Sequence, residues 1–455
     1  MKIAVIGGGI SGLSAAYRLR RSGVEAVVLE AAPDVGGKIK SERTDGFLVE
    51  HGPNGFLDSR VAVVRLARDV GLGGRILHAS DAAKDRFLFV DGHLKAVPSS
   101  PPAFLTSDIL SVRGRLRVLW EYFVSARRDT RDESIFDFAA RRIGPEAAER
   151  LVDAMVTGIF AGDSRQLSLP AAFPQMARLE REFGGLFKGM KALRKERSGG
   201  PNGPRGRLAS FQGGLTDLVS ACVNTMDSGA IHCGRPVSSV VANGDGRWRV
   251  LAQGGDALIV DGVVFTTPTP MTAQLVGDLS PSAATALEGI TYAPAAVVAL
   301  GYPESALDHP LDGFGFLVPS LEKRDILGVL WSSTLFADRA PDGQILLRTL
   351  VGGARRPELV GLDDEALVAT VAAELSVAFG CDLMTPSFER IVRWPQGIPQ
   401  YTMGHLDRVT KARAALSEQS GLFIAGNGVS GVSLADCAAA AETLPDEIRN
   451  QLGDG

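Results

Sequence analysis

The stretch Lys2-Ile3-Ala4-Val5-Ile6-Gly7-Gly8-Gly9-Ile10-Ser11-Gly12 opens the chain, and a second apolar run, Ala26–Leu29, ends at the acid Glu30. This order predicts a strand, a glycine turn, a helix over Leu13–Arg21 and a second strand that ends in a carboxylate. Such a unit binds a dinucleotide, because its glycines permit a tight turn and a close approach to the pyrophosphate, and the acid accepts hydrogen bonds from a ribose. We therefore expect the following residues to bind a dinucleotide: Gly7, Gly8, Gly9, Ile10, Ser11, Gly12 and Glu30.

A glycine pair follows the ribose acid, in the segment Val35-Gly36-Gly37-Lys38. It brings the backbone close to the dinucleotide a second time. An acid followed after several residues by Gly-Gly and a small or basic residue resembles the signature of the FAD-dependent amine oxidase and desaturase superfamily. A nicotinamide-dependent dehydrogenase does not need this pair, so the segment favours FAD and adds Gly37 and Lys38 to the expected cofactor-binding residues.

The composition is typical of a folded protein of two or three domains, with 455 residues, 45% of them apolar and 22% charged. A net charge of −4 gives no general electrostatic case for a nucleic-acid partner. The four cysteines are widely spaced and form no C-x-x-C pair, which argues against a zinc site or a disulfide framework and indicates a reducing compartment. No apolar run reaches the roughly 18–20 residues of a membrane-spanning helix. We expect a cytoplasmic protein without a metal site.

The fold class expected from these patterns is α/β, built on a Rossmann-like FAD-binding domain that insertions interrupt. Apolar strands and a helix over Asp363–Phe379 predict an α+β substrate-binding domain, and the first insertion is predicted to be helical. The predicted boundaries are 1–80, 206–270 and 388–455 for the discontinuous FAD-binding domain, 81–95 and 271–387 for the substrate-binding domain, and 96–205 for the helical domain.

The helical insertion carries a stretch, Pro101–Arg131, in which large apolar side chains are interleaved with arginines. An apolar face that enters the headgroup region and arginines that meet anionic lipid suit the surface of a membrane. The same pattern fits a helix whose apolar face packs on a core and whose basic face is solvated. Both interpretations stay open from the sequence, and with them a peripheral location on the cytoplasmic membrane.

Seven further short motifs resemble those of the protoporphyrinogen oxidase family of flavoenzymes, in the right order along nearly the whole chain. They are Glu50–Phe56, Arg86–Gly92, Thr157–Asp163, Ser210–Leu215, Val351–Arg355, Arg393–Tyr401 and Gly426–Val432. Many short motifs in order are more specific than the dinucleotide fingerprint alone. The resemblance implies the oxidation of a porphyrinogen to a porphyrin before haem formation, with non-covalent FAD as cofactor and molecular oxygen as the final electron acceptor.

The same resemblance implies roles for individual residues. Arg86 would anchor a substrate propionate, Phe336 and Leu317 would wall the macrocycle, and the carbonyl of Gly158 would lie near a pyrrole N–H. Flavin N5 takes a hydride and the macrocycle can lose its own N–H proton, so no catalytic side chain is implied. The further cofactor-binding residues implied are Gly52, Pro53, Asn54, Gly55, Val237, Trp394, Gly426, Asn427, Val432, Ser433 and Leu434.

Other functions stay open. Oxidation of coproporphyrinogen III, with four carboxylates in place of two, would favour extra basic residues around the substrate. An amine oxidase or carotenoid desaturase is less favoured, because five tyrosines and four tryptophans do not easily supply an aromatic cage over the flavin. A flavin- or haem-binding protein without activity would fail to reduce its flavin on mixing with a porphyrinogen. Cys437 is the one candidate for covalent flavin attachment, and a homodimer is also open.

Overall fold

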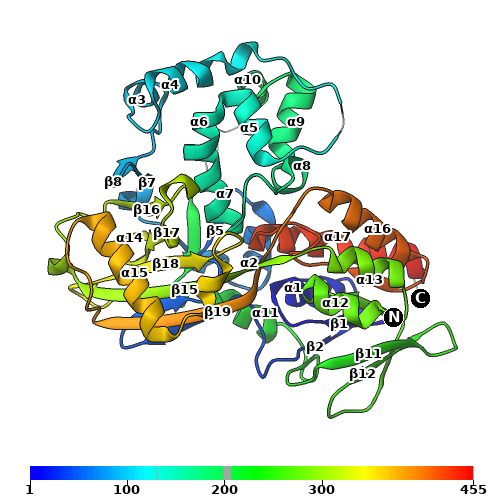
Figure 1. The fold of residues 1–455 in the computed structure, drawn as a ribbon. Coiled ribbons are helices and arrows are strands. Elements are labelled where there is room, and N and C mark those ends of the chain that lie inside the picture. The colour runs from blue at the N-terminus through cyan, green and yellow to red at the C-terminus, as the bar shows by residue number, and fades with distance from the viewer. Residues whose placement is uncertain (130, 198–205, 454–455) are drawn as a thin grey trace.

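The computed structural model describes residues 1–129, 131–197 and 206–453, and Figure 1 shows a helical lobe above two lobes that contain sheets. Within the described residues, five parallel strands form the first sheet, in the order β10-β2-β1-β14-β20. Their bounds are β1 (Lys2–Ile6), β2 (Glu25–Leu29), β10 (Ile231–His232), β14 (Gly262–Phe265) and β20 (Leu422–Ile424). Ile6 pairs with Phe265, and Phe265 pairs with Ile424, so three segments far apart in the sequence share one sheet.

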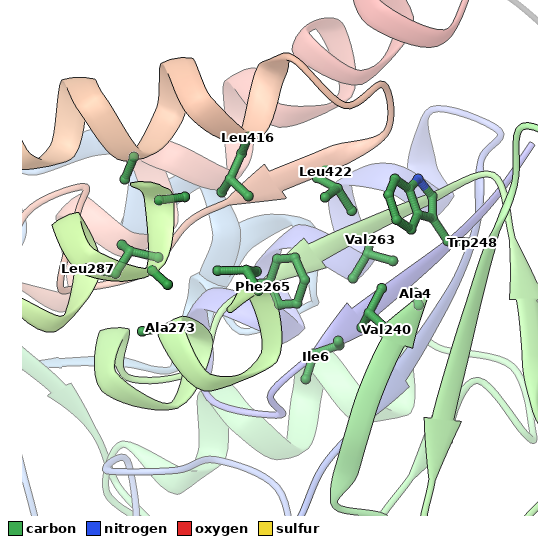
Figure 2. Packing of buried hydrophobic residues seen from close by; sticks show 14 of the residues in the cluster. Ala4, Ile6, Val240, Trp248, Val263, Phe265, Ala273, Leu287, Leu416 and Leu422 are labelled. Atoms are coloured by element: carbon green, nitrogen blue, oxygen red, sulfur yellow. The ribbon is translucent and has the colours of Figure 1, made fainter. Parts of the chain in front are cut away.

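Helices cover both faces of this sheet because successive side chains of a strand point to opposite faces. Ile3 and Val5 pack in the cluster formed with α1 (Ile10–Arg21) and α17 (Leu434–Leu452). Ala4 and Ile6 pack on the opposite side, in the cluster of Figure 2. That cluster joins the sheet to the elements α12 (Thr269–Val276), α13 (Pro281–Glu288), α16 (His405–Ser417), β11 (Val237–Ala242), β12 (Trp248–Ala252) and β13 (Leu258–Val260).

In the described part of the chain, seven strands form the second large sheet, in the order β19-β15-β18-β17-β16-β7-β8. The pair β16 and β7 is parallel and the other pairs are antiparallel. The bounds are β7 (Asp85–Val90), β8 (His93–Ala96), β15 (Tyr292–Pro303), β16 (Gly313–Leu317), β17 (Ile326–Trp331), β18 (Gln344–Gly352) and β19 (Phe388–Pro399). The predicted helix over Asp363–Phe379 is confirmed as α15 (Asp364–Phe379), which packs on one face of this sheet.

The first insertion, which forms the upper lobe in Figure 1, is helical, as predicted. Its elements are α3 (Pro101–Thr106), α4 (Val112–Leu119), the short 3₁₀ turn η3 (Trp120–Phe123), α5 (Ile135–Ile143), α6 (Pro145–Ala147), a π-helical turn (Ala148–Val152), α7 (Asp153–Phe160), α8 (Leu169–Ala172), α9 (Pro174–Phe183) and α10 (Leu186–Arg197). None of the helices that the structure describes is both long and apolar enough to cross a membrane.

Shorter elements connect the lobes. They are β3 (Ser41–Thr44), β4 (Phe47–Glu50), β5 (Phe56–Leu57), α2 (Val61–Asp69), β6 (Ile76–His78), β9 (Leu208–Phe211), α11 (Thr216–Asn224) and α14 (Ser332–Leu335). One boundary differs from the sequence-based division, which placed residues 388–399 with the FAD-binding domain. These residues form β19, the edge strand of the seven-stranded sheet, because β19 pairs along most of its length with β15.

Candidate active site

The first glycine turn has the tight geometry that its sequence predicts. Gly7 has a φ of 108°, and its amide donates to the Leu29 carbonyl at 2.9 Å. A Cβ atom at Gly12 would lie 1.9 Å from the Gly7 carbonyl oxygen, so α1 can approach the turn only because residue 12 has no side chain. A Cβ atom at Gly9 would meet nothing within 4 Å. The backbone at Gly9, the residue directly before α1, is therefore open to a ligand at the helix N-terminus. Ile10 and Ser11 form the first turn of this helix.

Glu30 lies directly after β2, beside this turn. One of its carboxylate oxygens accepts from the Gly8 amide, and the other accepts from the Ala32 amide at 2.8 Å. These bonds fix the carboxylate at the mouth of the turn and leave lone pairs on both oxygens for further donors. Val237, at the start of β11, lies two residues after Arg235, whose amide donates to the Glu30 carbonyl at 2.8 Å.

The second glycine pair packs directly against the first turn. The Gly36 amide donates to the Gly8 carbonyl at 2.8 Å, and a Cβ atom at Gly37 would lie 3.2 Å from the Cα of Gly9. Lys38 follows, partly buried, with its ammonium nitrogen 5.3 Å from the centre of the Tyr292 ring. Burial lowers the pKa of Lys38 to about 8, and it makes no ion pair with any described residue.

The loop Gly52–Gly55 is held from two sides. The guanidinium of Arg348, from the centre of β18, donates to the carbonyl of Glu50 at 3.0 Å and also to the carbonyl of Gly52. Burial lowers the pKa of Arg348 to about 10. From β19, the indole N–H of Trp394 donates to the His51 carbonyl at 2.7 Å. Within this loop, Pro53 and Asn54 are partly exposed, and a Cβ atom at Gly55 would lie 2.6 Å from the Ala209 carbonyl.

The third part of the candidate cofactor site is the glycine turn between β20 and α17. Gly426 has a φ of 113°. The buried Tyr401 hydroxyl donates to the Asn427 carbonyl and accepts from the Gly431 amide at 3.0 Å. Val432 leads into the helix, Ser433 is its N-cap residue, paired with Asp436 in a capping box, and Leu434 is its first residue. Asn427, Val432, Ser433 and Leu434 therefore lie at or just before the N-terminus of α17, in the turn that follows the strand β20.

Three features of this centre indicate a ligand. The side-chain nitrogen Nδ2 of Asn54 is buried and has no hydrogen-bond partner among the described residues. Such a group costs about 1–3 kcal/mol unless something binds it. Lys38 is a cation without an anionic partner in the described structure, and the Gly9 backbone faces open space. These residues fit a bound flavin nucleotide, whose phosphates and polar ring edge would satisfy the donors.

The residues predicted to bind substrate lie along β7 and β16. Arg86 is exposed on β7, with its guanidinium carbon 5.1 Å from the centre of the half-buried Phe314 ring. Further along β16, Leu317 lies against α7, since a Cβ atom at Gly158 would meet its side chain at 2.7 Å. Phe336 is 1% exposed and belongs to a small buried core, against which Phe314, the ring beside Arg86, also packs. The structure thus brings Arg86 next to Phe314 and Gly158 next to Leu317, and it buries Phe336.

Three residues of the centre were not singled out from the sequence. The sequence does contain a signal for Arg348, because it is the one charged residue in the predicted strand Ile345–Leu350. A buried arginine in such a run needs carbonyl or carboxylate partners, which points to a specific contact. Tyr401 had a signal as the last residue of the motif Arg393–Tyr401, whereas Phe314 had none, since an aromatic residue in a strand most often belongs to an ordinary core.

Comparisons with known proteins agree with this geometry. The family model for flavin-containing amine oxidoreductases matches residues 10–443. The chloroplastic protoporphyrinogen oxidase of Oryza sativa subsp. japonica is 34% identical over 474 residues, which cover 98% of this chain and 88% of that protein. The coproporphyrinogen III oxidase of Bacillus subtilis (strain 168) is 29% identical over 452 residues, which cover 96% of this chain and 95% of that protein.

A solved structure has the same fold over the full length. It comes from Exiguobacterium sp. 255-15, is provisionally assigned as a protoporphyrinogen oxidase, and is 28% identical with a TM-score of 0.85, covering 99% of this chain and 98% of that one. The similarity in sequence and fold extends over the glycine turns, the Gly52–Gly55 loop and the strands β7 and β16. The chain therefore belongs to the flavin-containing amine oxidoreductase family, in the group that contains the protoporphyrinogen oxidases.

Proposed function

We propose that this chain is an FAD-dependent oxidase that converts protoporphyrinogen IX to protoporphyrin IX in haem biosynthesis, with molecular oxygen as the electron acceptor. The observation that supports the proposal best is the 34% identity to a protoporphyrinogen oxidase over 98% of this chain, together with the exposed Arg86 beside the Phe314 ring. A flat, apolar tetrapyrrole with acidic arms needs an apolar wall and a cation for a propionate. Phe314 on β16 supplies apolar surface beside Arg86, and Leu317 is the last residue of the same strand.

The chain's own residues bind and orient in this proposal. Arg86 holds a propionate by a charge-assisted hydrogen bond, and Leu317 supplies apolar surface to the macrocycle. The carbonyl of Gly158 accepts from a pyrrole N–H and so fixes the rotation of the ring. Bound FAD would supply the two-electron acceptor for each oxidation step. Each hydride loss is accompanied by the loss of one proton, which a pyrrole N–H can release without a basic side chain; over three steps the nitrogens lose two protons in net and a meso carbon loses the third.

The test of this function is turnover with the purified protein. Protoporphyrinogen IX is offered in air, and the fluorescence of the porphyrin is followed against a sample without protein. The proposal predicts a rate proportional to protein concentration and saturable in substrate. Formation of porphyrin at the rate of the protein-free sample would contradict it.

Coproporphyrinogen III is a second candidate substrate. The specific observation in its favour is the match to the coproporphyrinogen III oxidase of Bacillus subtilis, which covers nearly the whole of both chains. Both porphyrinogens undergo the same ring oxidation and differ in the number of carboxylates. The ratio of kcat/KM for the two substrates therefore decides between them.

The cofactor is proposed to be FAD, held without a covalent bond. Cys437 on α17 is 5% exposed, and burial raises the pKa of its thiol to about 11. The nucleophilic thiolate is therefore scarce at neutral pH, which disfavours attachment to a flavin. Acid precipitation that leaves all yellow colour in the supernatant supports this proposal, and colour in the pellet contradicts it.

A peripheral contact with an anionic membrane is proposed for the surface around α4. Val118 of α4 packs against a core cluster, whereas most of the other apolar side chains of this surface are exposed, and Gly114 is the buried residue of α4. The exposed residues, with side chains up to 68% accessible, are Leu105, Val112, Leu116, Leu119, Trp120, Tyr122 and Phe123. Exposed Arg113 and Arg128 lie in the same segment and make no ion pair with described residues. Their charge favours anionic lipid as the partner of this surface.

A further inference from the structure

The seven-stranded sheet separates two groups of side chains, and two of the proposed substrate residues lie on the same face of it. Phe89 of β7 packs in the cluster that includes α15. Its neighbour Leu88 packs in a different cluster, which includes Ala154 of α7. Because alternate residues of a strand point to the same face, Arg86 lies on the face of Leu88. Leu317 packs against the same cluster as Leu88, so Arg86 and Leu317 share the sheet face that α7 covers.

One face of α7 is exposed, although the other five residues of this helix are buried. Met155 is 38% exposed and Ile159 is 43% exposed, and Gly158 beside them is exposed as well. Residues three and four apart lie on the same face of a helix. A Cβ atom at Gly158 would lie 2.7 Å from the side chain of Leu317. The exposed α7 face, which consists of Met155, Gly158 and Ile159, therefore adjoins Leu317 on the side of the sheet that bears Arg86.

The exposed α7 face is apolar and carries no charge. The one charged residue of this helix is Asp153, which lies on another face and is buried. Asp153 is already bound, because it accepts from Arg355 at 3.0 Å and from the Ser164 hydroxyl at 2.7 Å. A carboxylate placed against the exposed α7 face would lose water without gaining a cation from this helix, whereas an apolar group would lose nothing. This face therefore suits an apolar part of a ligand.

The C-terminal end of α7 is fixed by segments from outside the helical lobe. The side-chain amide of Gln400 donates to the Phe160 carbonyl at 2.8 Å. The backbone amide of Ala354 donates to the Ala161 carbonyl at 2.7 Å. Together with the ion pair between Arg355 and Asp153, these contacts hold the helix against the sheet. A surface on a fixed element discriminates between ligands better than a surface that can move away.

We propose that Met155 and Ile159 are specificity-determining residues, which contact the vinyl-bearing edge of protoporphyrinogen IX. The proposal rests on the proposed function. Protoporphyrinogen IX has its two acid arms on adjacent pyrroles and its vinyl groups on the other two, so an acid arm at Arg86 leaves an apolar edge for α7. Coproporphyrinogen III has an acid arm on every pyrrole and places carboxylates against α7 in each orientation that Arg86 can hold. The exposed α7 face therefore selects the di-acid substrate over the tetra-acid.

The test measures kcat/KM for both porphyrinogens with the FAD-loaded protein and with its variants Ile159→Lys and Met155→Lys. The unaltered protein should favour protoporphyrinogen IX about tenfold or more. Each lysine variant should lower kcat/KM for protoporphyrinogen IX about three- to tenfold and raise it for coproporphyrinogen III by a similar factor. The reason is that an ammonium group opposes a vinyl edge and pairs with a carboxylate.

Two control variants separate specificity from charge and from packing. Ile159→Leu keeps the surface apolar, so its preference should stay within about twofold of that of the unaltered protein. Val377→Lys puts the same charge on an apolar helical residue that is 49% exposed on α15, against the opposite face of the sheet. It should change neither substrate by more than about twofold. Flavin content and melting temperature, measured for every variant, identify any loss of folding.

Two results would overturn the assignment of Met155 and Ile159 and leave porphyrinogen oxidation standing. One is a preference of the unaltered protein for coproporphyrinogen III. The other is a ratio of the two kcat/KM values that stays within about twofold in both lysine variants while these keep their flavin. A protein that oxidises neither porphyrinogen contradicts the proposed function itself.

Discussion

Arg86 is exposed, and its guanidinium carbon lies 5.1 Å from the centre of the Phe314 ring. It makes no ion pair with a described residue. If it binds a propionate, Arg86→Ala should lower kcat/KM by about ten- to a hundredfold while the flavin stays bound. Arg86→Lys should recover only part of the activity, because an ammonium cannot form the two-pronged contact of a guanidinium. Steady-state kinetics of porphyrin formation measure both effects.

The matched control is Arg249→Ala, which removes an exposed arginine from β12. Most surface substitutions leave function and stability nearly unchanged, so its kinetics should stay within about twofold. If Arg86→Ala behaves like this control, Arg86 is a solvated charge and the propionate is held elsewhere.

Lys38 should make the affinity for FAD depend on pH. Without a ligand, burial lowers its pKa to about 8. Binding of an anionic pyrophosphate stabilises the ammonium and raises that pKa. Lys38 is then protonated in both states below pH 8, and the contribution to affinity is complete there. Above pH 8 the free protein loses the proton first, so the affinity should fall as the pH rises from about 8 toward the pKa of the complex.

Fluorescence titration of flavin-free protein with FAD between pH 6.5 and 10 measures this dependence. In Lys38→Met the affinity should be lower at pH 7, and its decline above pH 8 should be lost. An unaltered decline in the variant would assign the titration to another group and remove Lys38 from the site.

At the scale of elements, Arg348 connects the centre of β18 to the loop that carries Gly52–Gly55. Its guanidinium donates to two backbone carbonyls, and its side chain is buried. Arg348→Met leaves these carbonyls without their donor, so it should lower the free energy of unfolding by about 2–4 kcal/mol and release flavin. Urea unfolding and the flavin content of the purified variant measure this change.

Arg390→Met is the control for this prediction. Arg390 lies on β19 and pairs at the exposed surface with Glu42 at 2.7 Å. Exposed pairs contribute little, so the loss should be under about 1 kcal/mol. If both variants lose the same free energy of unfolding, the contacts of Arg348 stabilise the protein no more than an exposed ion pair does.

The exposed apolar surface of α4 and η3 should bind anionic liposomes reversibly. Trp120 is 60% exposed and Phe123 is 68% exposed. The double variant Trp120→Ser, Phe123→Ser should lose flotation with anionic vesicles and keep its activity on soluble substrate. Binding should also weaken at 1 M salt, where the screening length is about 3 Å. Flotation that is equal for neutral and anionic vesicles, or absent at low salt, would contradict the proposed contact.

At the scale of the molecule, local sequence patterns predicted the helices and strands well, but they predicted less well which lobe each segment belongs to. The strands and helix around the first glycine motif follow from residues adjacent in the sequence, and so does α15, which begins at its N-cap Asp363. The position of β19 depends on its pairing with β15, about a hundred residues earlier, which no local pattern of residues 388–399 encodes.

The same distinction holds for the site. The glycines and Glu30 could be predicted because a dinucleotide constrains their spacing. Phe314 lies beside Arg86 because β16 pairs in parallel with β7, a contact that follows from the tertiary fold alone. Phe336 is buried in a small core against which Phe314 packs, and its role at the macrocycle stays a prediction. Phe314 therefore needed the structure, whereas the position of the glycine turns did not.

The central claim is that a porphyrinogen gives its electrons to a flavin bound in this chain. The most direct test mixes the FAD-loaded protein with an excess of protoporphyrinogen IX without oxygen and follows the flavin absorbance near its visible maximum. The flavin should bleach rapidly and completely, and admission of oxygen should restore its colour while porphyrin fluorescence rises. A flavin that stays oxidised in the presence of the porphyrinogen, in protein that binds FAD and is folded, would contradict the account.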